Sequence, residues 1–200
     1  MLRRPRLAVI LLAAGLSRRM GRADKLLLSY AGVPLYERAL RLVTELEPQE
    51  TIVVTNTPVI REASRQHGFA AVPNPAAAQG IASSIACGVQ ALTQEADQLL
   101  FLNADQPLLR AAVVRRLLAE GTAYDAIIVP RQAGLPRSPC LFPARFRAEL
   151  AALQGDRGGR QVYARHSTET RFLEFTDPED FLDLDTQADF TALEQQRRTK

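Results

Sequence analysis

Residues 7–25 read LAVILLAAGLSRRMGRADK, an apolar run followed by small residues, glycines and positive charge. The run at 7–11 has the length and branched side chains of a strand buried on both faces of a sheet. Gly15 and Gly21 allow backbone conformations that other residues avoid, and small residues let a loop approach a ligand closely. Four basic side chains add charge to this loop: Arg18, Arg19, Arg22 and Lys25. Because successive backbone N–H groups can form an anion site, we expect a triphosphate to bind here.

Two other interpretations of this stretch remain open. It could be an ordinary strand-to-loop connection with solvated arginines, since neither GxxxxGK[ST] nor GxGxxG is present. It could also be a signal peptide, because Arg3, Arg4 and Arg6 precede the apolar run. Against export, Arg18 and Arg19 follow the run closely and no clear small-x-small cleavage site separates them from it.

Composition limits the remaining classes of function. A chain of 200 residues with 46% hydrophobic content suits a single domain, 1–200, with a real core. No segment approaches the roughly twenty apolar residues needed to span a bilayer, so we expect no membrane association. Cys87 and Cys140 are isolated, which predicts neither disulfides nor zinc and favours the cytoplasm. A net charge of +3 suits small anionic substrates and is too weak to predict nucleic-acid binding.

Apolar strand patterns alternate with helical patterns along the chain. Strands are expected at 7–11, 51–55, 69–72, 98–102, 125–129 and 171–175. Helices are expected at 35–48, 59–66, 81–92, 108–118, 146–153 and after Asp185, with the fourth stopped at Gly121. A basic stretch at 131–139 is expected to be irregular. This alternation predicts an α/β fold with a mostly parallel sheet covered by helices on both faces.

In such sheets ligands bind beyond the carboxyl ends of the strands. That rule brings four segments to one edge: residues 13–25, Asn56, residues 73–80 and residues 103–107. We therefore expect a single ligand site at this edge.

Acidic residues at two strand ends predict a metal at the same edge. Asp105 follows an apolar strand, and Asp183 and Asp185 follow a second short apolar segment. Each could equally be a helix cap or a solvated acid. Carboxylates from two such segments could hold one Mg²⁺, because this ion needs few protein ligands when phosphates and waters supply the rest. We assign the metal to Asp105 and Asp185.

Five motifs in order resemble one family of enzymes. They are LAAGxSxRMG…K at 12–25, the Asn74–Ile85 segment, Asp105-Gln106-Pro107, Gly155-Asp156-x-Gly158-x-Arg160 and Asp183-x-Asp185-Thr186. Together they are similar to the nucleotidyltransferases related to molybdenum cofactor cytidylyltransferase and guanylyltransferase, over about residues 7–190. The resemblance implies a three-layer Rossmann-like nucleotidyltransferase fold of the nucleotide-diphospho-sugar transferase type. It also implies Mg²⁺-dependent transfer of a nucleoside monophosphate to a phosphorylated pterin-type acceptor, with a molybdoenzyme as a possible client.

The resemblance also implies roles for individual residues. The catalytic residues would be Lys25, Asp105 and Asp185. The nucleotide-binding residues would be Leu12, Ala13, Ala14, Gly15, Arg19, Lys25, Asn56, Asn74, Gly80, Ser84 and Asp105. The acceptor-binding residues would be Arg137, Asp156 and Arg160.

Within this family, the Leu-Ala-Ala-Gly stretch at 12–15 resembles the cytidylyltransferases, whereas guanylyltransferases have Leu-Ala-Gly-Gly. We therefore expect CTP as the substrate. Three departures stand out: Gly159 replaces a usual Ala, Ser138 replaces a frequent His, and Gln187-Ala188 replaces Pro-Glu. The alternatives are a guanylyltransferase, another NTP transferase, or a binder that delivers the cofactor without catalysis.

Overall fold

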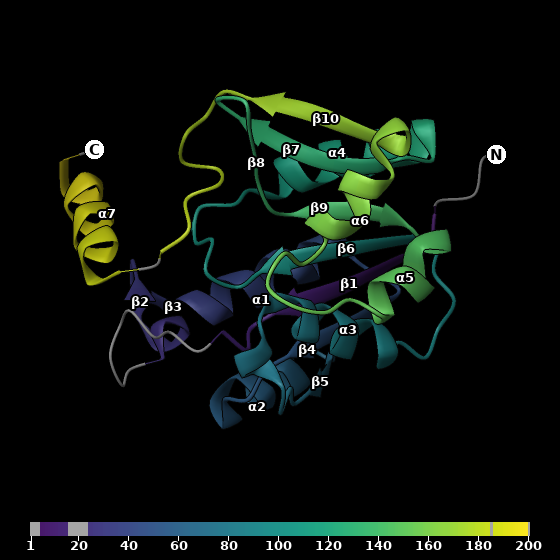
Figure 1. The fold of residues 1–200 in the computed structure, drawn as a ribbon. Helices are drawn as coiled ribbons and strands as arrows, with labels where there is room; N and C mark the ends of the chain where they lie inside the picture. The colour runs from purple at the N-terminus through teal and green to yellow at the C-terminus, as the bar shows by residue number, and fades with distance from the viewer. Residues whose placement is uncertain (1–4, 16–23, 185, 200) are drawn as a thin grey trace.

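The computed structural model describes residues 5–15, 24–184 and 186–199. An eight-stranded sheet forms the centre of this part of the chain, in the order β10-β7-β9-β6-β1-β4-β5, with β8 paired to β7 (Figure 1). Its strands are β1 (Leu7–Leu12), β4 (Glu50–Val54), β5 (Ala70–Val72), β6 (Gln98–Asn103), β7 (Ile127–Gln132), β8 (Leu135–Pro136), β9 (Cys140–Pro143) and β10 (Thr170–Phe175). The sheet is mostly parallel, as the sequence predicts, and only β8 and β9 run antiparallel to their neighbours.

Strand β1 lies between β4 and β6 and is parallel to both. Alternate side chains point to opposite faces, so Leu7, Val9 and Leu11 enter one core while Ala8 and Ile10 enter the other. This two-sided burial explains why the strand is apolar without alternation.

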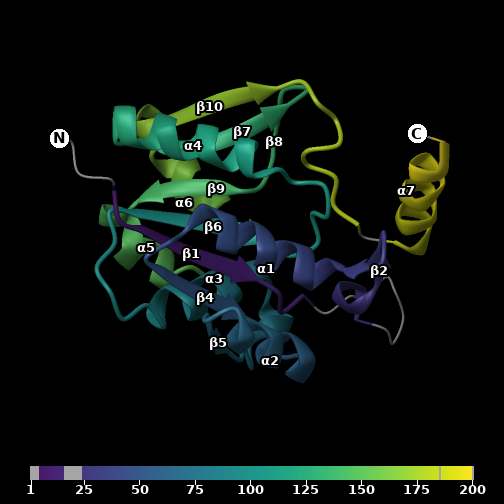
Figure 2. The same ribbon diagram turned by 180° about the vertical axis from the view of Figure 1, so that it is seen from behind.

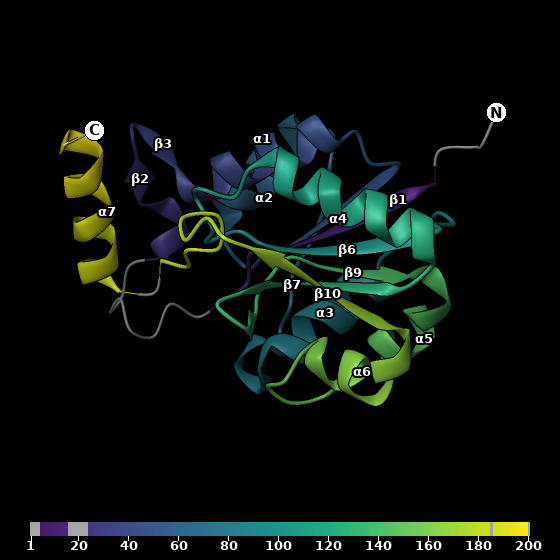
Figure 3. The same cartoon turned by 90° about the horizontal axis from the view of Figure 1, so that it is seen from above.

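Helices cover both faces of the sheet, which gives three layers (Figures 2 and 3). On one face lie α1 (Leu35–Leu46), α2 (Pro58–Gln66) and α4 (Ala111–Tyr124). On the other lie α3 (Ile81–Gln90), α5 (Arg147–Ala151) and α6 (Arg160–Arg165). Each layer buries an apolar stripe against the sheet, so the fold expected from the strand–helix alternation is confirmed.

The prediction for α4 is wrong at both ends. The helix begins at Ala111 and continues through Gly121 to Tyr124, where Asp125 adopts a left-handed conformation and ends it. Gly121 is no stop signal. A Cβ at this position would lie 2.4 Å from Leu141 Cδ2, so the glycine lets the helix pack closely on β9.

The stretch at 131–139 is more regular than expected. Strand β7 continues to Gln132, and Ala133 and Gly134, both at positive φ, turn it into the short strand β8. Strand β9 then inserts between β6 and β7. The two turn residues adopt the left-handed conformation that a tight hairpin requires.

The C-terminal helix α7 (Gln187–Thr199) lies outside the three layers, beside the hairpin of β2 (Ser29–Tyr30) and β3 (Val33–Pro34) (Figures 1 and 3). The Ala31 N–H donates a hydrogen bond of 3.1 Å to Glu194 Oε1, and Leu193 is buried. In the described part of the chain, no helix has the length and apolar character to cross a membrane.

Candidate functional site

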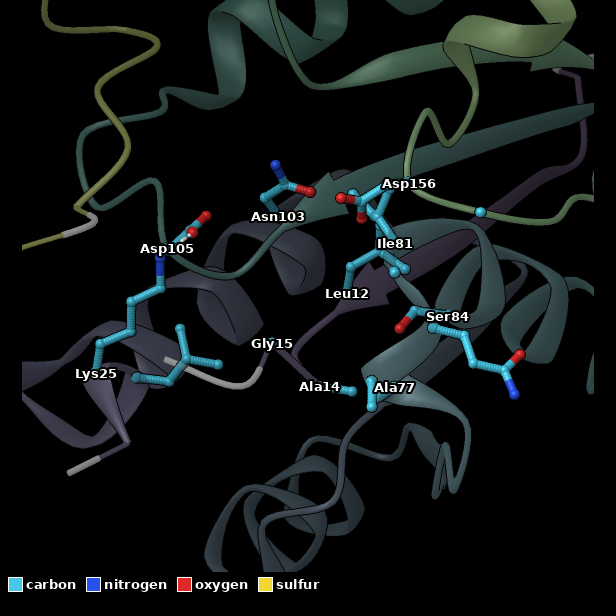
Figure 4. A pocket seen from close by; sticks show the side chains of 15 residues that line it. Leu12, Ala14, Gly15, Lys25, Ala77, Ile81, Ser84, Asn103, Asp105 and Asp156 are labelled. Carbon is cyan, nitrogen blue, oxygen red and sulfur yellow. Dashed lines mark hydrogen bonds and ion pairs between the residues drawn. The ribbon is translucent and has the colours of Figure 1, made fainter. Parts of the chain in front are cut away.

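A cavity of about 500 Å³ opens at the carboxyl edge of the sheet (Figure 4). Leu12, Ala14 and Gly15 after β1, and Asn103 and Asp105 after β6, form part of its wall. The rest comes from Lys25 and Leu26, from residues 77–81 with Ser84, and from Gly155 and Asp156. Three of the four segments expected at this edge therefore line one cavity, and a segment from the second half of the chain joins them.

Lys25 and Asp105 face each other at one side of this cavity (Figure 4). The distance from Lys25 Nζ to Asp105 Oδ2 is 2.6 Å, and their side chains are only 11% and 19% exposed. The other carboxylate oxygen, Asp105 Oδ1, is buried and has no hydrogen-bond partner among the described residues. A low local dielectric strengthens the electrostatic interactions of both charged groups. The pair therefore offers an ammonium for phosphate and an open carboxylate oxygen for a cation.

Asn56 and Asn74 do not line the cavity; they hold one of its walls. The Asn56 side chain forms two hydrogen bonds with the Asn74 backbone, at 2.8 and 2.9 Å. The Asn74 amide group donates to Ser83 Oγ and Ser84 Oγ and accepts from the Ala76 N–H. Asn74 is buried, and its amide oxygen and nitrogen both form hydrogen bonds. Since the amide nitrogen can only donate, the Ser84 oxygen accepts the hydrogen bond between them. The Ser84 hydroxyl proton, which has no acceptor among the described residues, is available to a ligand.

The glycine-rich loop at 155–160 contributes to two cavities. Asp156 lines the main cavity, whereas Arg157 and Arg160 line a second one of about 250 Å³. The second cavity also contains Arg137 and Tyr163, and it shares Leu12, Ile81 and Asn103 with the first. The structure thus separates Asp156 from Arg137 and Arg160, although the family resemblance groups the three on the acceptor side.

The second cavity is basic. None of Arg137, Arg157 and Arg160 forms a salt bridge with a carboxylate in the described ranges, and Arg137 Nε is buried without a hydrogen-bond partner. Burial raises the pKa of the Cys140 thiol to about 12, so this cysteine, which lines the same cavity, is neutral at pH 7. Desolvation likewise raises the pKa of Tyr163. The cavity therefore offers guanidinium groups for an anion and no thiolate nucleophile.

The segment before Asp185 is fastened next to Asp105. The Leu184 N–H donates to the Asp105 carbonyl at 3.1 Å. Arg110 Nε and Nη2 donate to the two oxygens of Asp180, whose side chain is only 3% exposed. Asp183 consequently lines the second cavity. Asp185 and Arg19, both predicted at the site, lie outside the described residues.

A model of the MobA-like NTP transferase domain matches residues 9–170. The chain belongs to the MobA-like NTP transferase family. Its match covers both cavities except for the segment that carries Asp183. The nucleotidyltransferase activity that the motifs imply is thus confirmed.

Individual relatives of this NTP transferase differ in their named activities. The molybdenum cofactor guanylyltransferase of Shewanella halifaxensis is 29% identical over 184 residues, which are 88% of each chain. The nicotine blue oxidoreductase of Paenarthrobacter nicotinovorans is 28% identical over 88% of this chain and 91% of its own.

Solved structures have the same fold. Rv0371c from Mycobacterium tuberculosis H37Rv is 25% identical, with a TM-score of 0.80 over 96% of this chain and 100% of that one. A structure described as Rv0371C complexed with manganese is 23% identical, with a TM-score of 0.75 over 95% of this chain and 98% of that one.

The NTP transferase site includes residues that the sequence analysis did not single out. Asn103 lines both cavities, and its place at the end of β6, two residues before Asp105, is a signal that could have identified it. Ile81 also lines both, and it is 39% exposed although it is apolar. Nothing in the sequence pattern marks Arg110 and Asp180, because an ion pair across 70 residues leaves no local signature.

Proposed function

We propose that this protein transfers CMP from CTP to the phosphate of the molybdenum-pterin cofactor and releases pyrophosphate. The observation that carries the proposal is the Lys25–Asp105 pair at the wall of the main cavity. A positive side chain and an open carboxylate oxygen meet there, at the carboxyl edge of a parallel sheet. Displacement at an α-phosphate needs positioning and charge neutralisation more than covalent chemistry.

The residues divide into roles that follow from their positions. Lys25 and the backbone N–H groups of Ala14 and Gly15 hold the triphosphate, while Ala14, Gly80 and Ser84 bound the space for the nucleoside. The Ala13 N–H, which the resemblance also assigns to the nucleotide, instead donates to the Val54 carbonyl at 2.9 Å. Asn56 and Asn74 keep Ser84 in place. In the reaction, an oxygen of the acceptor phosphate forms a bond to the α-phosphorus. The bond from that phosphorus to the β-phosphate oxygen breaks, and pyrophosphate leaves with the electron pair.

Asp105 fits a divalent cation. Its Oδ1 is a buried hard oxygen without a hydrogen-bond partner in the described ranges, which is the ligand type that Mg²⁺ prefers. The described residues contain no cluster of three or more acidic, histidine or cysteine side chains able to hold a metal. Phosphates and waters would supply most of the ligands, as is usual for Mg²⁺ bound with a nucleotide. We assign Asp185 as the second protein ligand. When bound, Mg²⁺ would neutralise charge on the phosphates.

Ala14 favours CTP over GTP. Ala14 is 6% exposed and lines the main cavity. A methyl group in the wall narrows the space for a base, and a pyrimidine tolerates this better than a purine. Differences of one methyl are worth only about 1–3 kcal/mol, so the preference is graded. The second candidate is GTP, because the Shewanella relative is named as a guanylyltransferase.

The second cavity suits the phosphorylated acceptor. Arg137, Arg157 and Arg160 can bind a phosphate through two parallel hydrogen bonds each, which lysine cannot do. The shared wall at Leu12, Ile81 and Asn103 brings an acceptor there next to a nucleotide in the main cavity. The Paenarthrobacter relative is named as an oxidoreductase, but this chain has no GxGxxG motif, which is the usual signature of dinucleotide binding. A molybdoenzyme would then receive the product.

The test is a panel of CTP, GTP, ATP and UTP with Mg²⁺ and the molybdenum-pterin cofactor, read by pyrophosphate release. We expect the highest rate with CTP and no release without the cofactor. A higher rate with GTP would make the protein a guanylyltransferase. Nucleotide binding without release for any of the four would instead support a non-catalytic carrier.

A further inference from the structure

Asp156 places a negative charge in a cavity that is otherwise suited to a polyanion. It lines the main cavity together with Gly15 and Lys25. No hydrogen bond or ion pair joins the Asp156 carboxylate to another residue in the described ranges. A carboxylate repels phosphates unless a cation lies between them, as we propose for Asp105. Without such a cation, Asp156 suits a part of the ligand that donates hydrogen bonds.

The position of this carboxylate is fixed by close packing on the start of α3. The Ala82 N–H donates to the Gly155 carbonyl at 3.2 Å. A Cβ on Gly80 would lie 2.5 Å from Asp156 Oδ1 and 2.8 Å from the Gly155 oxygen, so only glycine fits at position 80. Asp156 accepts no N–H of that helix, so its hydrogen-bonding capacity stays available.

A nucleoside triphosphate offers two kinds of donor: the ribose hydroxyls and the N–H groups of the base. Asp156 lies apart from Lys25 and Asp105 (Figure 4). It is also apart from Ala14 and Ala77, which lie on another side of the cavity (Figure 4). The ribose connects the base to the phosphates. It can therefore face the part of the cavity wall that carries Asp156, which we assign neither to the base nor to the phosphates.

We propose that Asp156 accepts hydrogen bonds from the ribose hydroxyls and thereby selects ribonucleotides over 2′-deoxyribonucleotides. The proposal rests on the proposed nucleotide site but concerns a different part of the ligand. The loop at 155–160 then contributes side chains to both cavities. Its acid faces the uncharged sugar, and its arginines face the phosphorylated acceptor in the second cavity.

The test compares Asp156→Asn and Asp156→Ala with the wild-type protein. Binding of CTP, 2′-deoxy-CTP and UTP in the presence of Ca²⁺ is measured by calorimetry, and kcat/KM for the same nucleotides is measured with Mg²⁺. For the wild type we expect CTP to be preferred over 2′-deoxy-CTP by about 10- to 100-fold, the range of one or two hydrogen bonds to a charged group. In Asp156→Ala the ratio should fall below about threefold. Asp156→Asn should lie between Asp156→Ala and the wild type, because its amide oxygen still accepts a hydrogen bond. The ratio of CTP to UTP should stay unchanged in both.

Glu62→Gln serves as the matched control, because it removes one exposed negative charge from α2, outside both cavities. It should leave both ratios as in the wild type. A collapse of the CTP to UTP ratio in the Asp156 variants would show that Asp156 contacts the base and would overturn the proposal. Unchanged ratios in variants that still bind CTP would overturn it as well. Failure of the wild type to bind any of the three nucleotides would refute the proposed function itself.

Discussion

Asp105 is the residue on which the proposed chemistry depends most. Asp105→Asn keeps the size and shape of the side chain but removes the charge that a divalent cation needs. We expect turnover to fall by about 1,000-fold or more, because metal stabilisation of phosphoryl charge is worth several kcal/mol. Mn²⁺ binding, followed by electron paramagnetic resonance, should weaken in parallel.

Asn is a better replacement than Ala at this position, because its amide oxygen can still accept a hydrogen bond from the largely buried Lys25 ammonium when the ion pair of 2.6 Å is removed. A thermal melt within a few degrees of the wild type controls for folding. Turnover near the wild-type rate in folded Asp105→Asn would contradict the proposed metal site.

Substitution of Lys25 should slow transfer of the nucleotide without weakening binding of the metal. Lys25→Met keeps the aliphatic stem and removes a donor to the charge that develops on the phosphates. The loss of one such preorganised donor costs about 3–4 kcal/mol, so we expect turnover to fall by about 100- to 1,000-fold. Mn²⁺ affinity should stay the same or rise, because the ammonium group no longer competes for Asp105. A turnover loss below threefold would exclude Lys25 from the transfer step.

Ala14 tests how the base is selected. Ala14→Gly removes the methyl group from the wall of the main cavity and should move the CTP to GTP preference toward GTP by about 10-fold, the lower range for one methyl group. The measurement is a competition between the two nucleotides at matched concentrations. If the preference does not move, the base is selected by other residues.

At the scale of elements, Gly121 shows how packing can override the usual effect of a glycine. In an exposed helix Gly→Ala stabilises by about 1 kcal/mol. In α4 the new methyl group would meet Leu141 Cδ2 at 2.4 Å and Gln98 Nε2 at 3.0 Å. We therefore expect Gly121→Ala to lower the free energy of unfolding by about 1–2 kcal/mol, measured by urea denaturation.

Ala119→Gly, at an exposed position of the same helix, calibrates the intrinsic preference and should cost about 1 kcal/mol. A more stable Gly121→Ala protein would mean that α4 and β9 can move apart without cost. The glycine would then be replaceable, and close packing would not be its reason.

Elements that can be predicted from sequence are those whose signal is local. Strand β1 and the strands beside it are continuous apolar runs, and helix α2 begins at Pro58 and ends before Gly68. Strand β9 is different, because nothing in Cys140–Pro143 specifies that it inserts antiparallel between β6 and β7. That insertion depends on a β7 partner 13 residues earlier in the chain and on β6 partners 39 to 45 residues earlier.

At the scale of the whole molecule, the sequence could predict the location of the site, which is the carboxyl edge of the sheet. The rule that ligands bind at the carboxyl ends of parallel strands brings the β1 loop and Asp105 together, and the structure places Lys25 next to Asp105. The same rule cannot tell whether a side chain faces the cavity or supports its wall. Asn74 supports it, and Asp156 lines the main cavity rather than the second one, because hydrogen bonds and close packing between distant segments determine both.

The most direct test of the proposed function follows the two ends of the nucleotide. The protein is incubated with Mg²⁺, the molybdenum-pterin cofactor and CTP labelled with ³²P at either the α- or the γ-phosphate, and the products are separated. Transfer of a nucleoside monophosphate predicts that the α-label moves to the pterin product and the γ-label appears in pyrophosphate, with neither change in Asp105→Asn. Label from the γ-phosphate on the pterin, or α-label found only in free CMP, would contradict nucleotidyl transfer.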